Sequence, residues 1–332
     1  MSLTISVAMC TFNGSRFLPA QLESIAAQER LPDELIICDD GSSDGSDAIA
    51  ADFAQHAPFP VRALKNEKNL GSTKNFEEAI SLCRGSVVAL ADQDDIWYPH
   101  KLSSIESVFR EIPAPVAVFS DADLIEENSE LTGLRLWKSF SFGPRDQSRF
   151  RNGEALRILI KHPVVTGATM AFRKEYVELL LPIPAKHVHD CWISFLLAAC
   201  GTLRPIAEPL MQYRRHRRQQ IGPGQSTLRG RFDRACSTGP RFYLDETVRF
   251  QQLHERLEQH REEFPYAAQA LSEIERKITH REHRARLPRA SVARIPKVLR
   301  EMVNGGYWRY SEGWQSVAKD MAGLFDHRNL FE

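Results

Sequence analysis

The feature that most constrains the fold of this chain is the alternation of short apolar segments with helix-like segments in its first half. The segment Leu3–Phe12 (LTISVAMCTF) is rich in β-branched and apolar residues and ends at Asn13-Gly14. This pattern predicts a buried strand that runs into a turn. A helix-like pattern follows from Phe17 to Gln28 and stops at Pro32. Strand and helix in this rhythm predict a parallel sheet with right-handed crossovers.

The alternation continues along the chain. Further buried strands are predicted at Glu34–Asp40, Pro60–Glu67, Gly85–Asp95 and Pro115–Ile125. The intervening helices begin near Ser46 or Asp47 and near Ser72 or Thr73, whose side chains can cap a helix.

The pattern is less regular from Leu131 to Pro163. Beyond it, a strand is predicted at Val164–Phe172 and a short apolar helix at Asp190–Gly201. IGPGQS (Ile221–Ser226) is the clearest break, and the residues after it are rich in Arg, Glu, Gln and His. We therefore expect a boundary near Pro223, with an α/β domain over residues 1–225 and a mainly helical region over residues 226–332.

The composition narrows the class of protein. The chain has 332 residues, with 43 basic and 43 acidic side chains, so no global positive field indicates a nucleic-acid partner. No apolar run reaches the ~18–20 residues that cross a bilayer, and no signal-peptide pattern opens the chain. The six cysteines form no C-x-x-C pair, which argues against a structural zinc site and favours reduced core residues of a cytoplasmic protein.

Polar clusters directly follow three of the predicted strands. They are Thr11–Gly14, Asp39–Ser42 and Asp92–Asp95. In an open α/β sheet, ligands bind outside the carboxyl ends of the strands. The sequence therefore predicts a site at this edge of the sheet, with acidic groups delivered by separate strands.

The segment ADQDD places three carboxylates, Asp92, Asp94 and Asp95, within four residues. Such a cluster is tolerated when a cation neutralises it, and hard oxygen ligands suit Mg²⁺ or Mn²⁺ that bridge substrate phosphates. The alternative is a solvated acidic turn. Asp39 and Asp40 can likewise either shape a βα turn or accept hydrogen bonds from a nucleotide base or ribose.

Several segments in order resemble the signatures of family 2 glycosyltransferases, which have the GT-A fold. They are ISVAMCTFNGSRFL, LIICDDGSSDGS, NLGSTKNFEEAI and VALADQDDIWYPHKL, followed by VTGATMAFRKE, HDCWI and YRRHRRQQIG. The resemblance covers about the first 220 residues. The later segments are similar to those of bacterial members that build O-antigen and capsule chains, such as rhamnosyltransferases. Residues 1–225 would then be the GT-A catalytic domain that binds a nucleotide sugar.

The resemblance implies a role for each motif residue. The nucleotide pocket would be lined by Thr11, Asn13, Asp39, Asp40, Gly71, Lys74 and Asp92. Asp92 would contact the ribose, Asp94 would bind the metal, and Asp95 would support them. Gly71 permits close backbone approach to the donor. Lys74 would approach the base or phosphates, unless it is a solvated helix charge.

Asp190 in HDCWI is the candidate general base, because in this family a carboxylate that opens a helix takes the proton of the acceptor hydroxyl. The family often has Glu-Asp here, whereas this chain has His189-Asp190. The structural alternative for Asp190 is an N-cap of the apolar helix.

His216 in YRRHRRQQIG would complete the metal shell or touch the diphosphate; its alternative is a purely structural histidine. Arg217 and Arg218 replace the small or amide residues usual at these positions in the family. They could bind phosphate, belong to a loop that closes over the donor, or form a solvated basic face.

The resemblance implies an inverting, metal-dependent transferase that uses dTDP-rhamnose or a UDP-sugar. The acceptor would be a glycan or a lipid-linked oligosaccharide of a bacterial surface polysaccharide. The alternatives are a non-catalytic scaffold of the same fold and a sugar nucleotidyltransferase. TFNGSRFL does not resemble the Gly-rich basic phosphate loop of the latter class.

The C-terminal region matches no motif. Basic and apolar residues alternate between Arg281 and Arg300, and arginines 229, 231 and 234 surround Phe232. Such helices can lie on an anionic membrane, here the inner face of the plasma membrane. The alternative is packing on the catalytic domain or on a second subunit in a homo-oligomer. Trp308, Trp314 and Phe325 suit either role.

Overall fold

The computed structural model describes residues 3–111, 113–216, 240–264, 267–288 and 290–323. The chain divides into two compact units, Met1–Ala155 with Val164–Pro223, and Leu156–Pro163 with Gly224–Glu332. The predicted boundary at Pro223, the residues Arg217, Arg218 and Phe325, and the cluster around Phe232 lie outside the described residues.

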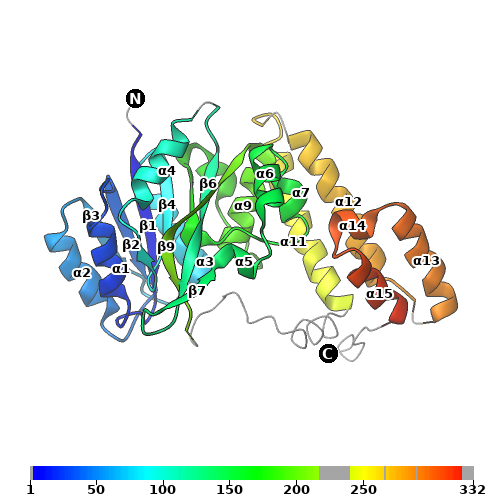
Figure 1. The fold of residues 1–332 in the computed structure, drawn as a ribbon, viewed down its shortest axis with the longest axis horizontal. Coiled ribbons are helices and arrows are strands. Elements are labelled where there is room, and N and C mark those ends of the chain that lie inside the picture. The colour runs from blue at the N-terminus through cyan, green and yellow to red at the C-terminus, as the bar shows by residue number, and fades with distance from the viewer. Residues whose placement is uncertain (1–2, 112, 217–239, 265–266, 289, 324–332) are drawn as a thin grey trace. The chain divides into compact units, whose positions relative to one another are not determined.

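The first half of the sheet in the first unit is parallel, as the alternation predicts. Its strands are β1 (Ile5–Thr11), β2 (Glu34–Asp39), β3 (Val61–Lys65) and β4 (Val87–Asp92), in the order β3-β2-β1-β4. They alternate with the helices α1 (Leu18–Ala26), α2 (Ser46–His56) and α3 (Ser72–Leu82), as Figure 1 shows. Every residue of β1 is buried, which explains why this strand reads as a continuous apolar run.

The second half of the sheet is mixed rather than parallel. β8 (Met170–Arg173) runs antiparallel between β4 and β6 (Ala117–Ile125), and β9 (Leu203–Arg214) runs parallel to β6. Two short strands, β5 (Ile96–Trp97) and β7 (Leu131–Arg135), pair antiparallel with β9 and β6. The predicted strand Val164–Phe172 is shortened because Gly167–Thr169 forms a 3-10 turn.

Short helices complete the first unit. They are α4 (Lys101–Phe109), α5 (Leu136–Ser139), α6 (Pro144–Arg151), α8 (Val177–Leu180) and α9 (His189–Cys200), with a 3-10 turn at Lys174–Tyr176. The predicted serine and threonine caps are wrong. Gly45 and Gly71 occupy the N-cap positions of α2 and α3 with positive φ angles of 92° and 80°, which glycine adopts without steric cost.

The second unit is helical over its described residues. Its helices are α11 (Pro240–Gln259), α12 (Ala267–Ala285), α13 (Ser291–Val303), α14 (Gly306–Tyr310) and α15 (Trp314–Ala322). A further helix, α7 (Ala155–Leu159), lies where the chain passes from one unit to the other. No helix in the described part of the chain is both long and apolar enough to span a bilayer.

A candidate active site at the carboxyl edge of the sheet

The strand register brings the three polar clusters to one edge of the sheet. Thr11 at the end of β1 is level with Asp39 at the end of β2, and Cys10 is level with Asp92 at the end of β4. The Thr11 hydroxyl donates a hydrogen bond of 2.8 Å to Oδ2 of Asp39. The carboxyl ends of neighbouring parallel strands therefore meet where the sequence predicts a site.

Asp39 and Asp40 are buried and shape the loops at this edge. Asp39 also accepts hydrogen bonds from the backbone amide of Ser42 at 2.8 Å and from its hydroxyl at 2.6 Å. Asp40 accepts from the amides of Leu70 at 2.7 Å and Gly71 at 2.9 Å, and from the Asn66 side chain. Because a carboxylate has about four acceptor positions, each aspartate has about one acceptor position without a bond described here.

Asn13 connects the loop after β1 to the loop after β2. Its φ angle of 47° is left-handed, a conformation that asparagine tolerates better than most residues. Its amide donates to the Ser42 hydroxyl at 2.9 Å, and its Oδ1 accepts from the Ser43 amide at 3.0 Å. The backbone amide and the side-chain oxygen of Asn13 thus hold the two loops together.

Gln93 is a site residue that the sequence analysis missed. Its Oε1 accepts from the Phe12 amide at 2.8 Å, and its Nε2 donates to the Phe12 carbonyl at 3.1 Å. This side chain therefore joins the acidic turn to the loop after β1. The one sequence feature that could have drawn attention to Gln93 is its place between Asp92 and Asp94. That place suggests no function beyond separating the two carboxylates.

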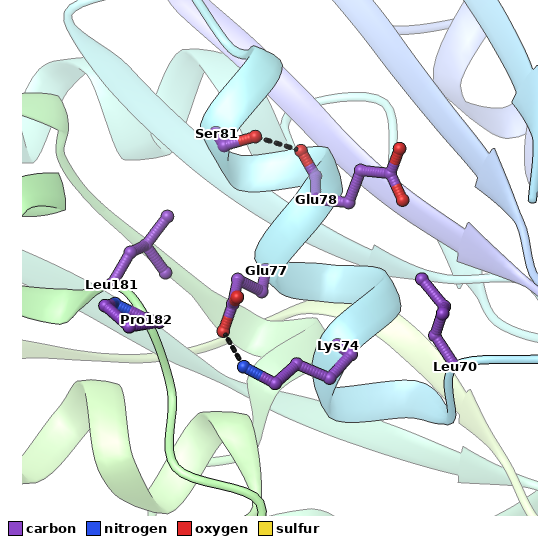
Figure 2. A pocket seen from close by; sticks show the side chains of 7 residues that line it. All are labelled: Leu70, Lys74, Glu77, Glu78, Ser81, Leu181 and Pro182. Atoms are coloured by element: carbon purple, nitrogen blue, oxygen red, sulfur yellow. Dashed lines mark hydrogen bonds and ion pairs between the residues drawn. The ribbon is translucent and has the colours of Figure 1, made fainter.

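Lys74 on α3 is held by an ion pair and lines a pocket. Its Nζ forms an ion pair of 2.7 Å with Glu77 (Figure 2). The Glu77 carboxylate also accepts a hydrogen bond from the Ile183 amide at 2.6 Å. The lysine lies in a pocket of about 520 Å³. This pocket is lined by Leu70, Lys74, Glu77, Glu78, Ser81, Leu181 and Pro182. Leu70 links it to the loop that Asp40 holds.

The acidic turn has strongly perturbed carboxyl groups. Burial, reinforced by the charges of Asp94 and Asp190, raises the pKa of Asp92 to about 7. Asp95 is 1% exposed, and burial followed by the charges of Asp94 and Asp92 raises its pKa well above the usual range. Its Oδ1 accepts from the Arg214 amide at 3.0 Å, whereas its Oδ2 has no hydrogen-bond partner among the described residues.

β9 brings His216 to this acidic turn from far along the chain. Its Nε2 lies 2.7 Å from Oδ2 of Asp94, and the two side chains are 10% and 12% exposed. The imidazole also packs 5.2 Å from the Phe17 ring. Arg214 fixes the end of β9, because its Nε donates to the Asp94 carbonyl at 2.7 Å.

These groups fit part of a divalent-cation site. One carboxylate and one imidazole lie together, and the buried Oδ2 of Asp95 beside them lacks a hydrogen donor. No cluster of three or more His, Cys, Asp or Glu side chains in the described ranges could hold an ion by itself. Mg²⁺ commonly takes one or two protein ligands and completes its shell with phosphates and water. The donor set therefore suits a metal that shares its shell with a diphosphate.

Asp190 lies in the first turn of α9 and is not the N-cap, a position that Val188 occupies. Its two carboxylate oxygens accept from the amides of Cys191 at 2.6 Å and Gly167 at 3.4 Å. Its charge contributes to the raised pKa of Asp92, so the two carboxylates interact electrostatically.

His189 is buried beside Asp190. Its ring stacks on Phe76 with centroids 4.1 Å apart, and burial lowers its pKa. A side chain at Gly167 would meet Nε2 of this ring at 2.7 Å. The histidine therefore packs as a neutral ring, and the small residue at position 167 makes room for it.

Lys101 is a second residue that the sequence analysis missed. It is 1% exposed, and its Nζ donates to the Ala168 carbonyl at 2.8 Å and lies 4.2 Å from the Trp97 ring centre. Burial lowers its pKa to about 7, while the charges of Asp95 and Asp92 oppose this shift. A lysine that opens an amphipathic helix reads as a surface residue, so the sequence carries no local signal of this burial.

Comparison with known proteins agrees with this fold. A Staphylococcus aureus TarS structure (residues 1–349, in complex with UDP-GlcNAc) superposes with a TM-score of 0.56 at 14% identity, covering 98% of this chain and 93% of that one. The mannosyltransferase PcManGT of Pyrobaculum calidifontis, in complex with GDP-Man and Mn²⁺, superposes with a TM-score of 0.51 at 16% identity, covering 98% and 85%. At such identities the likeness shows the fold alone.

Two of the sequence relatives are described as glycosyltransferases. An uncharacterized glycosyltransferase of Nostoc sp. is 28% identical over 64% of this chain and 65% of its own length. The Escherichia coli UDP-Glc:alpha-D-GlcNAc-diphosphoundecaprenol beta-1,3-glucosyltransferase WfgD is 30% identical over 30% of this chain and 38% of its own. The chain thus spans less than two thirds of these relatives. Residues 6–181, more than half of the chain, match the model of glycosyl transferase family 2, and the chain belongs to that family.

Proposed function

We propose that this protein is an inverting glycosyltransferase that moves a sugar from a nucleoside diphosphate to an acceptor hydroxyl. The observation that carries the proposal is the convergence of three separate segments at one sheet edge. Asp92 ends β4, His216 follows β9 beside Asp94, and Asp190 opens α9 with a charge that acts on Asp92. The catalytic machinery would lie within residues 1–225, and residues 226–332 would form a separate helical region.

Each residue has one task in this reaction. Asp190 takes the proton of the acceptor hydroxyl while the acceptor oxygen bonds to the anomeric carbon. The bond from that carbon to the diphosphate oxygen breaks on the opposite face, which inverts the configuration. A Mg²⁺ or Mn²⁺ ion bound by Asp94 and His216 would neutralise charge on the departing diphosphate. Asp92 would bind the ribose, and Asp95 would support the turn.

The donor pocket would be formed by Thr11, Asn13, Asp39 and Asp40, with Gly71 and Lys74 on its rim. A buried aspartate can accept the N3–H of uracil or thymine, which suits a UDP-sugar or dTDP-rhamnose. Solved relatives of the fold bind UDP-GlcNAc or GDP-Man, the latter with Mn²⁺. This supports a diphosphate donor with a divalent ion.

The acceptor would be a glycan or a lipid-linked oligosaccharide in bacterial surface polysaccharide synthesis. The Escherichia coli relative, by its name, acts on a diphosphoundecaprenol-linked sugar, which supports a lipid-linked acceptor here. Such an acceptor would place the enzyme at the inner face of the plasma membrane. Arg217 and Arg218 would bind donor phosphate on this proposal.

Replacement of Asp190 tests the proposal. We expect Asp190→Asn to lower the transfer rate about 10²–10⁴-fold, the usual contribution of a general base, with donor binding retained. Binding is measured as the thermal shift produced by UDP, dTDP or GDP with Mn²⁺. Asp52→Asn, a change at an exposed position of α2, is the control and should leave both measurements unchanged.

Two results would contradict the assignment. If Asp190→Asn folds normally but loses the diphosphate shift together with transfer, Asp190 binds the donor instead of acting as the base. If no diphosphate shifts the wild-type protein with any metal, the donor pocket itself is wrong.

A further inference from the structure

One helix of the second unit exposes an apolar stripe. On α13, the exposed fractions of Val292, Ile295, Leu299 and Val303 are 87%, 39%, 46% and 88%. Their spacing of three, four and four residues places them on one face of the helix. The inner side of the helix is anchored by Val298, which is fully buried in a cluster with residues of α14 and α15. The stripe is therefore a surface feature of a helix that is already packed on its inner side.

The charges of α13 are arranged asymmetrically. Lys297 and Arg300 are exposed, whereas the only carboxylate of this helix, on Glu301, lies 2.6 Å from the imidazole of His280. Arg294 points inward and donates to the Met321 carbonyl at 3.1 Å. The outer surface of α13 therefore combines four aliphatic side chains with two cations and carries no exposed carboxylate.

The sequence left two roles open for the arginines from Arg281 to Arg300, a membrane-facing surface or internal packing, and some of them pack internally. Arg281 and Arg284 are 6% and 2% exposed and bind Glu246 and Asp320 inside the helical unit. They are not available to an external anion. Of the described basic residues in this stretch, Arg286, Lys297 and Arg300 are exposed. Arg300 lies at the side of the apolar stripe, where its long side chain can extend its charged end toward headgroups.

We propose that α13 is a membrane-surface helix that inserts Val292, Ile295, Leu299 and Val303 among the headgroups of an anionic leaflet. Arg300, about a quarter turn around the helix from the stripe, contacts the lipid phosphates, whereas Lys297 lies on the side away from the stripe and stays in water. An amphipathic helix with aliphatic residues and basic flanks has the chemistry of an interfacial anchor. A second copy of this chain is a poorer occupant, because pairing two identical stripes would bring the cations of both copies together without an exposed carboxylate. The inference rests on the proposed function in one respect, since a lipid-linked acceptor is reached at a membrane.

Vesicle flotation of the full chain, without donor or acceptor, tests the proposal. We expect binding to vesicles of phosphatidylcholine with phosphatidylglycerol, and weaker binding to phosphatidylcholine alone. Leu299→Glu should weaken binding about tenfold or more, because it places a charge where an aliphatic side chain enters the interface. Arg300→Gln should weaken binding to the anionic vesicles about fivefold.

Leu244→Glu is the matched control, because Leu244 on α11 is 43% exposed, close to the value for Leu299, and lies off the stripe. It should bind vesicles within about twofold of the wild type. The proposal is overturned if the wild type does not float, if both leucine variants lose binding equally, or if light scattering shows that Leu299→Glu instead dissociates a dimer. The diphosphate thermal shift is unaffected by these outcomes, so failure of the anchor and failure of the donor site are distinguishable.

Discussion

Lys101 shows how a single buried charge organises the candidate site. Its ammonium group contacts the Ala168 carbonyl and the Trp97 ring. Ala168 lies in the turn whose first residue, Gly167, donates its amide to Asp190. The lysine therefore supports the backbone that holds the proposed general base, while its charge opposes the repulsion between Asp92 and Asp95.

Substitution of Lys101 by Met should reveal its charge state through the pH dependence of stability. Below pH 7 the lysine is charged in both the folded and the unfolded chain. Burying this charge therefore lowers the free energy of unfolding by its full amount. Above pH 7 the folded protein releases the proton, whereas the unfolded chain keeps it up to about pH 10.4. The wild type should therefore gain stability relative to Lys101→Met across this window, by up to about 1.4 kcal/mol per pH unit.

Urea denaturation of both proteins at several pH values measures this difference. If the difference in unfolding free energy between the wild type and Lys101→Met stays constant with pH, Asp92 and Asp95 keep the ammonium group charged. A difference that falls as pH rises would contradict the direction of the pKa shift itself.

At the scale of elements, the loop after β1 and the acidic turn after β4 are joined by the two hydrogen bonds of Gln93 to Phe12. Gln93→Leu removes both bonds at a largely solvated position, which should cost about 1 kcal/mol of stability. Because the loop carries Asn13 and the turn carries Asp92, we expect donor affinity to fall about fivefold. The exposed Gln55→Leu on α2 is the control.

Titration calorimetry with the diphosphate that gives the largest thermal shift measures the effect. Equal affinities for Gln93→Leu and Gln55→Leu would show that the two loops hold their relative position without this side chain.

The elements that could be predicted from the sequence are those whose pattern depends on local periodicity. β1, β2 and β4 are buried on both faces and read as continuous apolar runs. β9 was not predicted, because Pro205 and Pro209 are typical of non-strand segments; β9 shifts register against β6 on either side of Pro209. This long strand carries Arg214 and leads to His216. Both residues contact the acidic turn only because β9 pairs with β6, and no local sequence pattern shows that pairing. The assigned roles in catalysis stay predictions.

At the scale of the whole molecule, each unit has its own buried core, and the core of the helical unit is partly ionic. Arg284 binds Asp320 with two hydrogen bonds of 2.7 and 2.8 Å, and the Tyr307 hydroxyl also donates to Asp320 at 2.7 Å. Lys277 on the same helix donates to the carbonyls of Ile160 and Tyr310. Charged residues at helical spacing read as a solvated face, which is why the sequence did not predict this core.

Replacement of Asp320 tests the ionic core. Asp320 and Arg284 are 0% and 2% exposed, so Asp320→Asn leaves a guanidinium charge buried without its counterion. We expect a loss of about 3–5 kcal/mol in the unfolding free energy of the helical unit, measured by chemical denaturation followed by circular dichroism. Glu258→Gln breaks the exposed pair with Arg261 and should change stability by about 1 kcal/mol or less.

A loss of stability in Asp320→Asn has two candidate causes, the unbalanced charge and the lost hydrogen bonds. The double variant Asp320→Leu with Arg284→Met distinguishes them. If the unbalanced charge causes it, removing both charges should restore most of the stability, because apolar residues of similar volume often replace a buried ion pair without cost. If the double variant is as unstable as Asp320→Asn, the hydrogen bonds to Tyr307 and Ser311 hold the unit together instead. In either case the diphosphate thermal shift, which depends on the first unit, should persist, and its loss would show that the donor site requires an intact helical unit.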